Sequence, residues 1–191
     1  MTTIAPDPPT AIETSRLLLR RYRREDAAMY YQAIRANWDH LYEFLPPQQE
    51  AMRSAADAEA VIAWLEEMWK RREIFVFGAW ERAAGEYIGE AYLANADWHV
   101  PCIEVGYFVV KDKTGQGYAS EAARALVDFA FTQLGVIRVE LQCRADNLAS
   151  QRVAERIGFT LEGRQRARHR KKSGELVDRL WYGLVKEIQL P

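Results

Sequence analysis

Residues 112–120 connect an apolar segment to an amphipathic one through a glycine-containing loop, Asp-Lys-Thr-Gly-Gln-Gly-Tyr-Ala-Ser. The preceding run, Ile103–Val110, is typical of a buried strand, and Ala119–Leu134 repeats its apolar residues at helical spacing. Amides in the first turn of a helix lack intrahelical partners and carry partial positive charge. Gly115 and Gly117 would let a ligand approach that backbone closely. The segment therefore predicts a strand, a turn and a helix whose N-terminus suits a pyrophosphate.

Two common nucleotide-binding motifs fit this loop poorly. A nucleotidase phosphate loop requires Lys and Ser/Thr after its last glycine, whereas Tyr118 follows Gly117 here. The dinucleotide fingerprint requires Gly or Ala where this chain has Ser120, and an acid about 20 residues further on. That acid would be Glu140, which lies inside the apolar run Val136–Cys143 rather than at its end. A nicotinamide-dependent oxidoreductase is retained only as an alternative.

The loop resembles the Gln/Arg-x-x-Gly-x-Gly/Ala signature of the GNAT superfamily of acetyltransferases. Gly115 and Gly117 match its two small positions, while Asp112 departs from its first position. The departure puts a side-chain contact in doubt and leaves the backbone contacts intact. The resemblance implies that acetyl-CoA is the co-substrate and that its pyrophosphate contacts Thr114, Gly115, Gln116, Gly117, Tyr118, Ala119 and Ser120.

Residues 144–163 resemble a second block, Asn-x-x-Ser…Gly-Phe-x-x-Glu-Gly, found in one GNAT branch. That branch contains the bacterial enzymes that acetylate the N-termini of ribosomal proteins. A third segment, Asn37–Pro46, is similar to the early substrate-side helix of the same branch, and the similarity runs from about Thr14 to Ile188. These blocks indicate the superfamily and the branch, but not the substrate. The matching positions of the second block are Asn147, Ser150, Gly158, Phe159, Glu162 and Gly163.

The order of the predicted elements indicates an α/β fold with a mixed sheet. One strand is followed by two helices, three strands, a helix, a strand, a helix and two strands. The GNAT resemblance implies a mostly antiparallel seven-stranded sheet, splayed between its fourth and fifth strands, with about four helices. The pantetheine arm of the coenzyme would enter the splay.

The composition is that of an ordinary globular domain. The chain has 191 residues, of which 49% are apolar and 28% charged, and its net charge is −1. We expect a flexible lead over residues 1–13 and a single N-acetyltransferase domain over 14–188. The near-zero charge gives no reason to expect direct nucleic-acid binding, and no apolar run is long enough to predict a membrane span.

Cysteine and histidine usage bears on compartment and metal chemistry. Cys102 and Cys143 do not form a disulfide framework, which favours a reducing compartment, and we expect a cytoplasmic protein. Three scattered histidines and two cysteines have no metal-ligand spacing, so no metal site is expected.

Several residues are candidates for the acetyl-transfer chemistry. Asn147 is suited to cap a helix, and the resemblance adds a hydrogen bond from it to the pantetheine arm. Ser150 is the only hydroxyl between Asn147 and Gly158, and the resemblance makes it the proton donor to the departing thiolate. Its alternative role is a first-turn serine serving the helix end. Backbone amides of Phe108, Val109 and Val110 would polarise the acetyl carbonyl.

Two residues compete for the role of general base, because an attacking amine must lose its proton. Glu104 is an acid inside an apolar strand, where an unpaired carboxylate is costly. His169 titrates near physiological pH. Both also have plain interpretations as solvent-facing residues. His169 stands among four arginines at alternate positions, Arg164 to Arg170, which on a strand would share one face.

These features predict an enzyme that transfers an acetyl group from acetyl-CoA to a primary amine by direct attack on the thioester. The preferred acceptor is a protein or peptide N-terminus, such as that of a ribosomal protein. A small amine (polyamine, amino acid or aminoglycoside) and a non-catalytic acyl-CoA-binding module are the alternatives, and a homodimer is left open.

Overall fold

The computed structural model describes residues 7–186. Its centre is one sheet of eight strands in the order β1-β2-β3-β4-β5-β6-β8-β7. Neighbouring strands are antiparallel except β5 and β6, which are parallel. The strands are β1 (Ala11–Glu13), β2 (Leu17–Arg20), β3 (Phe75–Glu81), β4 (Tyr87–Asp97), β5 (Cys102–Val109), β6 (Arg138–Arg144), β7 (Thr160–Arg170) and β8 (Leu176–Val185).

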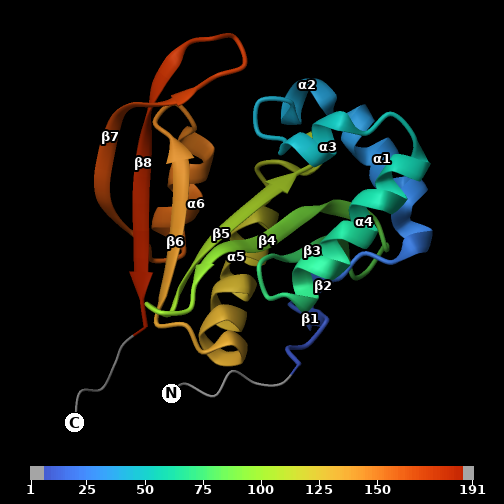
Figure 1. Cartoon of the computed structure of the whole chain (residues 1–191), viewed down its shortest axis with the longest axis horizontal. Coiled ribbons are helices and arrows are strands. Elements are labelled where there is room, and N and C mark those ends of the chain that lie inside the picture. The colour runs from blue at the N-terminus through green and yellow to red at the C-terminus, as the bar shows by residue number, and fades with distance from the viewer. Residues whose placement is uncertain (1–6, 187–191) are drawn as a thin grey trace.

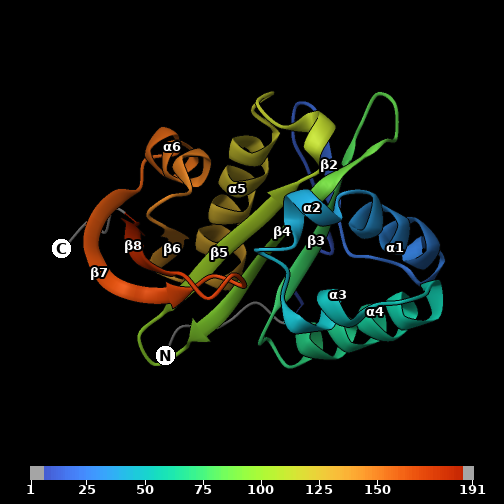
Figure 2. The same ribbon diagram turned by 90° about the horizontal axis from the view of Figure 1, so that it is seen from above.

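Six α-helices cover the two faces of this sheet (Figure 1). Figure 2 shows α5 and α6 on one face and α1, α3 and α4 on the other. The helices are α1 (Ala27–Ala36), α2 (Trp38–Leu41), α3 (Pro47–Ala51), α4 (Ala55–Lys70), α5 (Tyr118–Phe129) and α6 (Leu148–Arg156). No helix in the described part of the chain is long and apolar enough to cross a membrane.

The sheet opens between β5 and β6. Only three residue pairs connect the two strands, from Cys102 with Arg138 to Glu104 with Glu140. Beyond these pairs β5 continues to Val109 beside β4, while β6 continues to Arg144 beside β8. The sheet therefore consists of two halves that share one end and diverge at the other, as Figure 1 shows.

The predicted mixed, mostly antiparallel α/β fold is confirmed, and the element counts need correction. The eighth strand is β1, which pairs with β2 and lies within the expected N-terminal lead. When β1 is set aside, the splay does fall between the fourth and fifth strands. The two additional helices, α2 and α3, have only four and five residues, and such short helices leave little periodicity to recognise in a sequence.

A bulge interrupts the predicted arginine face of β7, although all four arginines are exposed. Four steps along β7, from Gln165 to His169, correspond to two along β8, from Arg179 to Val177. Ala167 lies within this bulge with φ of 51°. The backbone amide of Ala167 donates to the Asp178 carboxylate at 2.8 Å. The bulge interrupts the period of two on which the prediction rested.

A buried carboxyl connects the sheet to the helices on the α1 side. Tyr22 and Tyr30 each donate a hydrogen bond to Glu90 Oε2 at 3.0 Å. The amide of Gln49 in α3 donates to Glu90 Oε1 at 2.9 Å. The Tyr87 hydroxyl lies 2.7 Å from that of Tyr22. Burial raises the pKa of Glu90 to about 7, although the three hydrogen bonds oppose this shift.

This network predicts how stability depends on pH. Because the folded-state pKa of Glu90 exceeds its ordinary value of 4.5, folding favours the protonated group. Its contribution is fully present below pH 4.5 and is lost as the pH rises through 7, by roughly 3 kcal/mol in total. The Glu90→Gln variant removes this titration. Denaturant unfolding between pH 4.5 and 8 should show the free energy of the wild type falling relative to the variant, whereas parallel curves would contradict the assignment.

Candidate active site

The glycine loop after β5 presents unpaired backbone amides. It begins with a 3-10 turn, Lys111–Lys113, and continues to Gly117, which precedes α5. Gly115 and Gly117 have φ of 75° and 85°, a left-handed conformation that favours glycine. No hydrogen bond within residues 7–186 uses the amides of Gly115, Gln116 or Gly117. The next three amides, from Tyr118 onward, belong to the first helical turn and have no intrahelical acceptor. This run of donors fits a pyrophosphate.

A segment distant in sequence fixes this loop. Arg16 donates from Nη1 to the Gln116 carbonyl at 3.0 Å and from Nε to Glu121 Oε2 at 2.7 Å. Its guanidinium also lies over the Tyr118 ring, 4.4 Å from the centroid. The hydroxyl of Thr14 donates to Glu121 Oε1 at 2.6 Å. Because the Gln116 carbonyl bonds to Arg16, the loop is held with its amides unpaired.

The open edge of β5 supplies further backbone donors. Val110 donates its amide to the Ile88 carbonyl of the β4 side at 2.9 Å, so it is not available to polarise an acetyl group. Antiparallel pairing alternates, so Phe108 also directs its peptide groups toward β4. By the same alternation, Tyr107 and Val109 direct theirs into the gap between β5 and β6. Of the three predicted amides, that of Val109 therefore faces the opening.

Ser150 lies on the α5 and α6 face of the opening. Its Oγ is 3.1 Å from the Tyr107 hydroxyl of β5. Asn147 accepts a hydrogen bond from the Ser150 backbone amide at 3.1 Å and so caps α6. Burial raises the pKa of the Tyr107 hydroxyl and that of the nearby Cys143 thiol. The two hydroxyls are positioned to pass a proton from one to the other.

Glu104 lies on the opposite face of the opening. Its Oε2 accepts hydrogen bonds from Asn95 at 2.9 Å and from Gln142 at 3.0 Å. Among the described residues no hydrogen bond reaches its Oε1. Burial raises the pKa of Glu104, while the hydrogen bond from Asn95 and the charge of Arg179 oppose that shift. A carboxylate with one free oxygen can accept a proton from an amine.

His169 belongs to the same chain of contacts. Arg179 donates to Gln142 Oε1 at 2.9 Å and lies 3.2 Å from His169 Nδ1. A guanidinium only donates, so Nδ1 is the acceptor and the neutral ring carries its proton on Nε2. Burial and the charges of Arg179 and Arg144 lower the pKa of His169. The sequence left two candidate bases, and this geometry favours Glu104, because the lone pair of His169 is already engaged.

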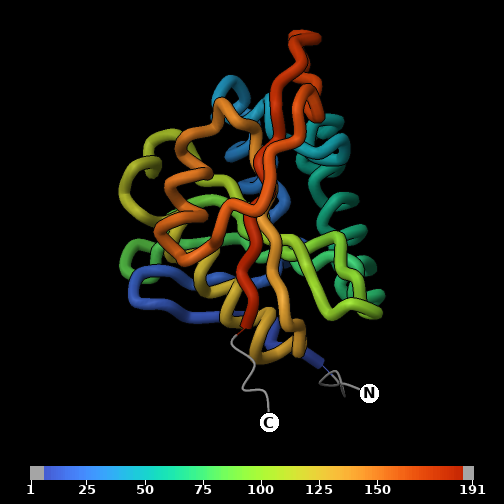
Figure 3. Tube along the Cα trace, turned by 90° about the vertical axis from the view of Figure 1, so that its left-hand side faces the viewer, coloured from blue at the N-terminus to red at the C-terminus, as the bar shows by residue number. Residues whose placement is uncertain are grey.

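Ion pairs join the α2–α3 segment to β6 and to the β7–β8 turn. Glu43, after α2, pairs with Arg144 of β6 at 2.9 Å. Lys172, in the turn between β7 and β8, pairs with Glu50 of α3 at 2.7 Å. Figure 3 shows this hairpin extending beyond the rest of the sheet. The hairpin and the α2–α3 segment therefore border the Glu104 side of the opening.

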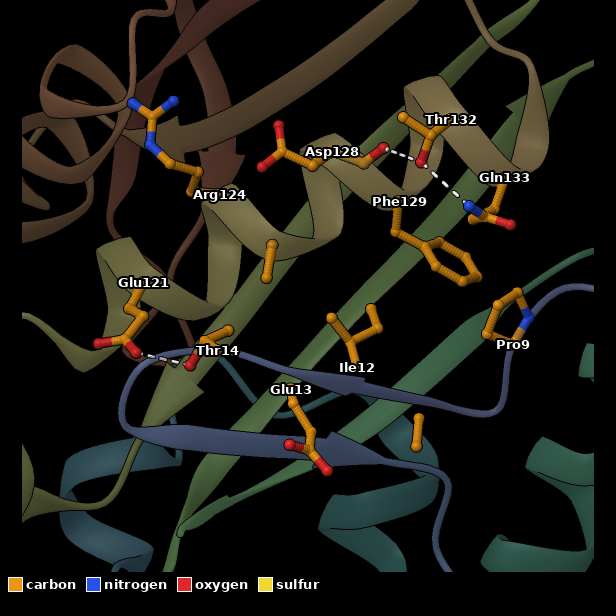
Figure 4. Close-up of a pocket in the computed structure, with 12 residues that line it drawn as sticks. Pro9, Ile12, Glu13, Thr14, Glu121, Arg124, Asp128, Phe129, Thr132 and Gln133 are labelled. Carbon is orange, nitrogen blue, oxygen red and sulfur yellow. Dashed lines mark hydrogen bonds between the residues drawn. The ribbon is translucent and has the colours of Figure 1, made fainter.

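A separate groove of about 450 Å³ lies between β1 and α5. Figure 4 shows Ile12 of β1 and Phe129 of α5 between the two elements, with Glu13 and Glu121 nearby. None of the predicted site residues lines it. Its charged lining residues are three acids and Arg124, which disfavours an anionic coenzyme. The glycine loop and the β5–β6 opening thus remain the candidate site.

The sequence model of the GNAT acetyltransferase domain matches residues 16–160. The chain belongs to the GNAT family of acetyltransferases. It is 28% identical over 176 residues to the uncharacterized N-acetyltransferase YoaA of Bacillus subtilis, which covers 92% of this chain and 96% of YoaA. Over a shorter segment the sequence identity is higher. The chain is 43% identical over 61 residues to the ribosomal-protein-serine acetyltransferase of Escherichia coli, a match that covers 31% of this chain and 34% of that protein.

The fold is also that of a solved acetyltransferase. The structure of RimL, a ribosomal L7/L12 alpha-N-protein acetyltransferase in complex with coenzyme A, superposes with a TM-score of 0.83. It covers 92% of this chain and 97% of RimL at 22% identity, which shows a shared fold. In this GNAT protein no group of three or more His, Cys, Asp or Glu among residues 7–186 is arranged to hold a metal ion.

The structure brings together residues that the sequence singled out and others that it did not. Glu104 and His169 are linked through Gln142 and Arg179, and Ser150 meets Tyr107. The side chain of Tyr118 is buried, so only its backbone faces the loop. The missed residues carried little signal, since β6 alternates polar residues such as Gln142 with apolar ones and Arg179 follows Asp178 in β8.

The Gly117→Asp variant tests the loop. A carboxylate would stand where the backbone must meet phosphate, so we expect coenzyme A affinity to fall at least about tenfold with the fold retained. Gly174→Asp is the control, because Gly174 also has a positive φ (92°) but lies in open space in the β7–β8 turn, whereas a Cβ on Gly117 would lie 3.4 Å from Arg16 Nη2. Equal affinities of the two variants in calorimetric titration would refute the loop assignment.

Proposed function

We propose that this GNAT acetyltransferase transfers the acetyl group of acetyl-CoA to a primary amine, and that its acceptor is the N-terminal amine of a protein or peptide. The observation that carries the proposal is the placement of Ser150 and Glu104 on opposite faces of the β5–β6 opening. A thioester lying in that opening has a proton donor on its sulfur side and a proton acceptor on its amine side.

The proposed acceptor class has its support in relatives. The relative from Escherichia coli is named a ribosomal-protein-serine acetyltransferase. The Glu104 side is bordered by the β7–β8 hairpin and the α2–α3 segment, which are the elements that an approaching chain terminus would contact. We therefore place the ribosomal-protein N-terminus first among candidate acceptors.

The proposed mechanism begins at Glu104. Its free Oε1 accepts a proton from the acceptor ammonium, directly or through one water, and leaves a neutral amine. The amine nitrogen then forms a bond to the thioester carbonyl carbon while the Val109 amide stabilises the developing oxyanion. As the carbon–sulfur bond breaks, Ser150 donates a proton to the thiolate and Tyr107 passes one to Ser150. The second proton of the amine nitrogen leaves through water and restores the Tyr107 hydroxyl, and Glu104 releases the first proton to solvent. The products are the N-acetylated acceptor and the free thiol of coenzyme A.

Thiol release in the presence of N-terminal peptides tests the function directly. We expect release only when both acetyl-CoA and a peptide with a free N-terminus are present, with a matching mass increase of the peptide. The same peptides with blocked N-termini are the control. Coenzyme binding without acetylation of any amine would instead support the non-catalytic binding module.

The Ser150→Ala variant separates proton donation from helix capping. The cap uses the backbone amide of Ser150, so alanine retains it and stability should change little. Turnover should fall by about a hundredfold, because the thiolate departs without its donor. Coenzyme A affinity should remain near that of the wild type. Full turnover, measured on the same preparation as the melting temperature, would eliminate Ser150 as the donor.

Conservative variants distinguish the two candidate bases. Glu104→Gln should lower turnover at every pH and keep coenzyme binding. In the wild type the rate should rise with pH as Glu104 ionises, at a pH above the ordinary carboxyl range because burial raises its pKa. His169→Gln should retain this acidic limb. If the limb disappears in His169→Gln and persists in Glu104→Gln, the assignment of the base is reversed.

A further inference from the structure

Arg179 lies on the Glu104 side of the opening, and among residues 7–186 it has no carboxylate partner. Other half-buried arginines, including Arg20, Arg138 and Arg144, each form an ion pair with an acid at 2.9 Å or less. Arg179 instead contacts a neutral amide, Gln142 Oε1, and the neutral ring of His169. No ion pair joins it to any acid within residues 7–186. A half-buried cation held by neutral partners has unused capacity for an anion.

Arg179 lies close to Glu104, the proposed base, with Gln142 between them. Gln142 donates to Glu104 with its nitrogen at 3.0 Å and accepts from Arg179 with its oxygen at 2.9 Å. The Gln142 carboxamide thus lies between the Glu104 carboxylate, which would receive the acceptor's proton, and the Arg179 guanidinium. An acceptor whose amine reaches Glu104 therefore places atoms a few bonds away near Arg179.

We propose that Arg179 binds a carboxylate of the acceptor, so that the preferred substrates carry a carboxylate close to the reacting amine. This inference rests on the proposed function, in which the amine approaches Glu104. Guanidinium groups suit carboxylates because their planar donors match two oxygens. The carboxylate can belong to an acidic first residue of a peptide or to the α-carboxyl group of a free amino acid.

An indirect role of Arg179, exerted through Glu104, leads to a different expected outcome. Its charge opposes the raised pKa of Glu104, and it holds Gln142, which contacts Glu104. If Arg179 acted only through Glu104, its loss would slow the acetylation of every amine by the same factor and would move the acidic limb of the pH–rate profile to higher pH. Selectivity between acceptors separates the two roles.

The experiment measures kcat/KM for matched acceptors with and without the carboxylate. One pair is a peptide that begins with Asp and the same peptide that begins with Asn; the other is alanine and alaninamide. The first pair tests an acidic side chain, and the second tests an α-carboxyl group. We expect the wild type to prefer the carboxylate member of at least one pair by about tenfold or more.

The enzymes compared are the wild type, Arg179→Gln, Arg179→Lys and Arg71→Gln. Arg179→Gln should abolish the preference and retain coenzyme A affinity, and Arg179→Lys should keep part of it, since lysine retains the charge without the planar donors. Arg71 is an exposed residue at the end of α4 and serves as the matched control, which should behave as the wild type.

Equal kcat/KM for both members of both pairs in the wild type would overturn the inference and leave the proposed function intact. An equal loss for all acceptors in Arg179→Gln would also overturn it, in favour of the role through Glu104. Acetylation of none of the amines by the wild type would overturn the proposed function and the inference with it.

Discussion

The short parallel contact between β5 and β6 is the constraint on which the rest of the structure depends. Three residue pairs hold the strands together, and then each continues beside a different neighbour. Parallel strands require a crossover, which here is the glycine loop and α5. The same connection that opens the sheet therefore places free loop amides and the N-terminus of a helix at the mouth of the opening. The alternation of side chains along β5 then places Tyr107, which contacts Ser150 of α6, on one face and Glu104 on the other.

Where β5 and β6 diverge, their backbone groups no longer pair with each other, and side-chain contacts hold the surrounding elements in place. Arg16 holds the loop from a distant segment, and Glu43 with Arg144 joins the two halves across the gap. Glu90 connects β4 to α1 and α3 through donors that are all neutral. The helices beside the acceptor side are thus attached through a carboxyl whose proton is lost near neutral pH.

Local signals in the sequence indicated the mixed α/β fold, and the family resemblance added the splayed sheet and the candidate site residues. The loop residues Gly115 and Gly117 and the cap Asn147 lie in contiguous motifs, so spacing and resemblance identified them. The contact of Tyr107 with Ser150, 43 residues apart, and that of Arg179 with Gln142, 37 residues apart, depend on strand register, which no local pattern reveals. The bulge at Ala167, which interrupts the predicted arginine face, was hidden for the same reason, because a period of two holds only in a regular strand.

Hydrogen exchange with and without coenzyme A tests most directly the central claim that the β5–β6 opening and its glycine loop form the coenzyme site. We expect coenzyme A to slow exchange of the amides of Gly115 to Ser120 and of those of Tyr107 and Val109, which face the opening. Exchange in the groove between β1 and α5 should be unchanged. Unchanged exchange in the loop, or protection confined to that groove, would contradict the account.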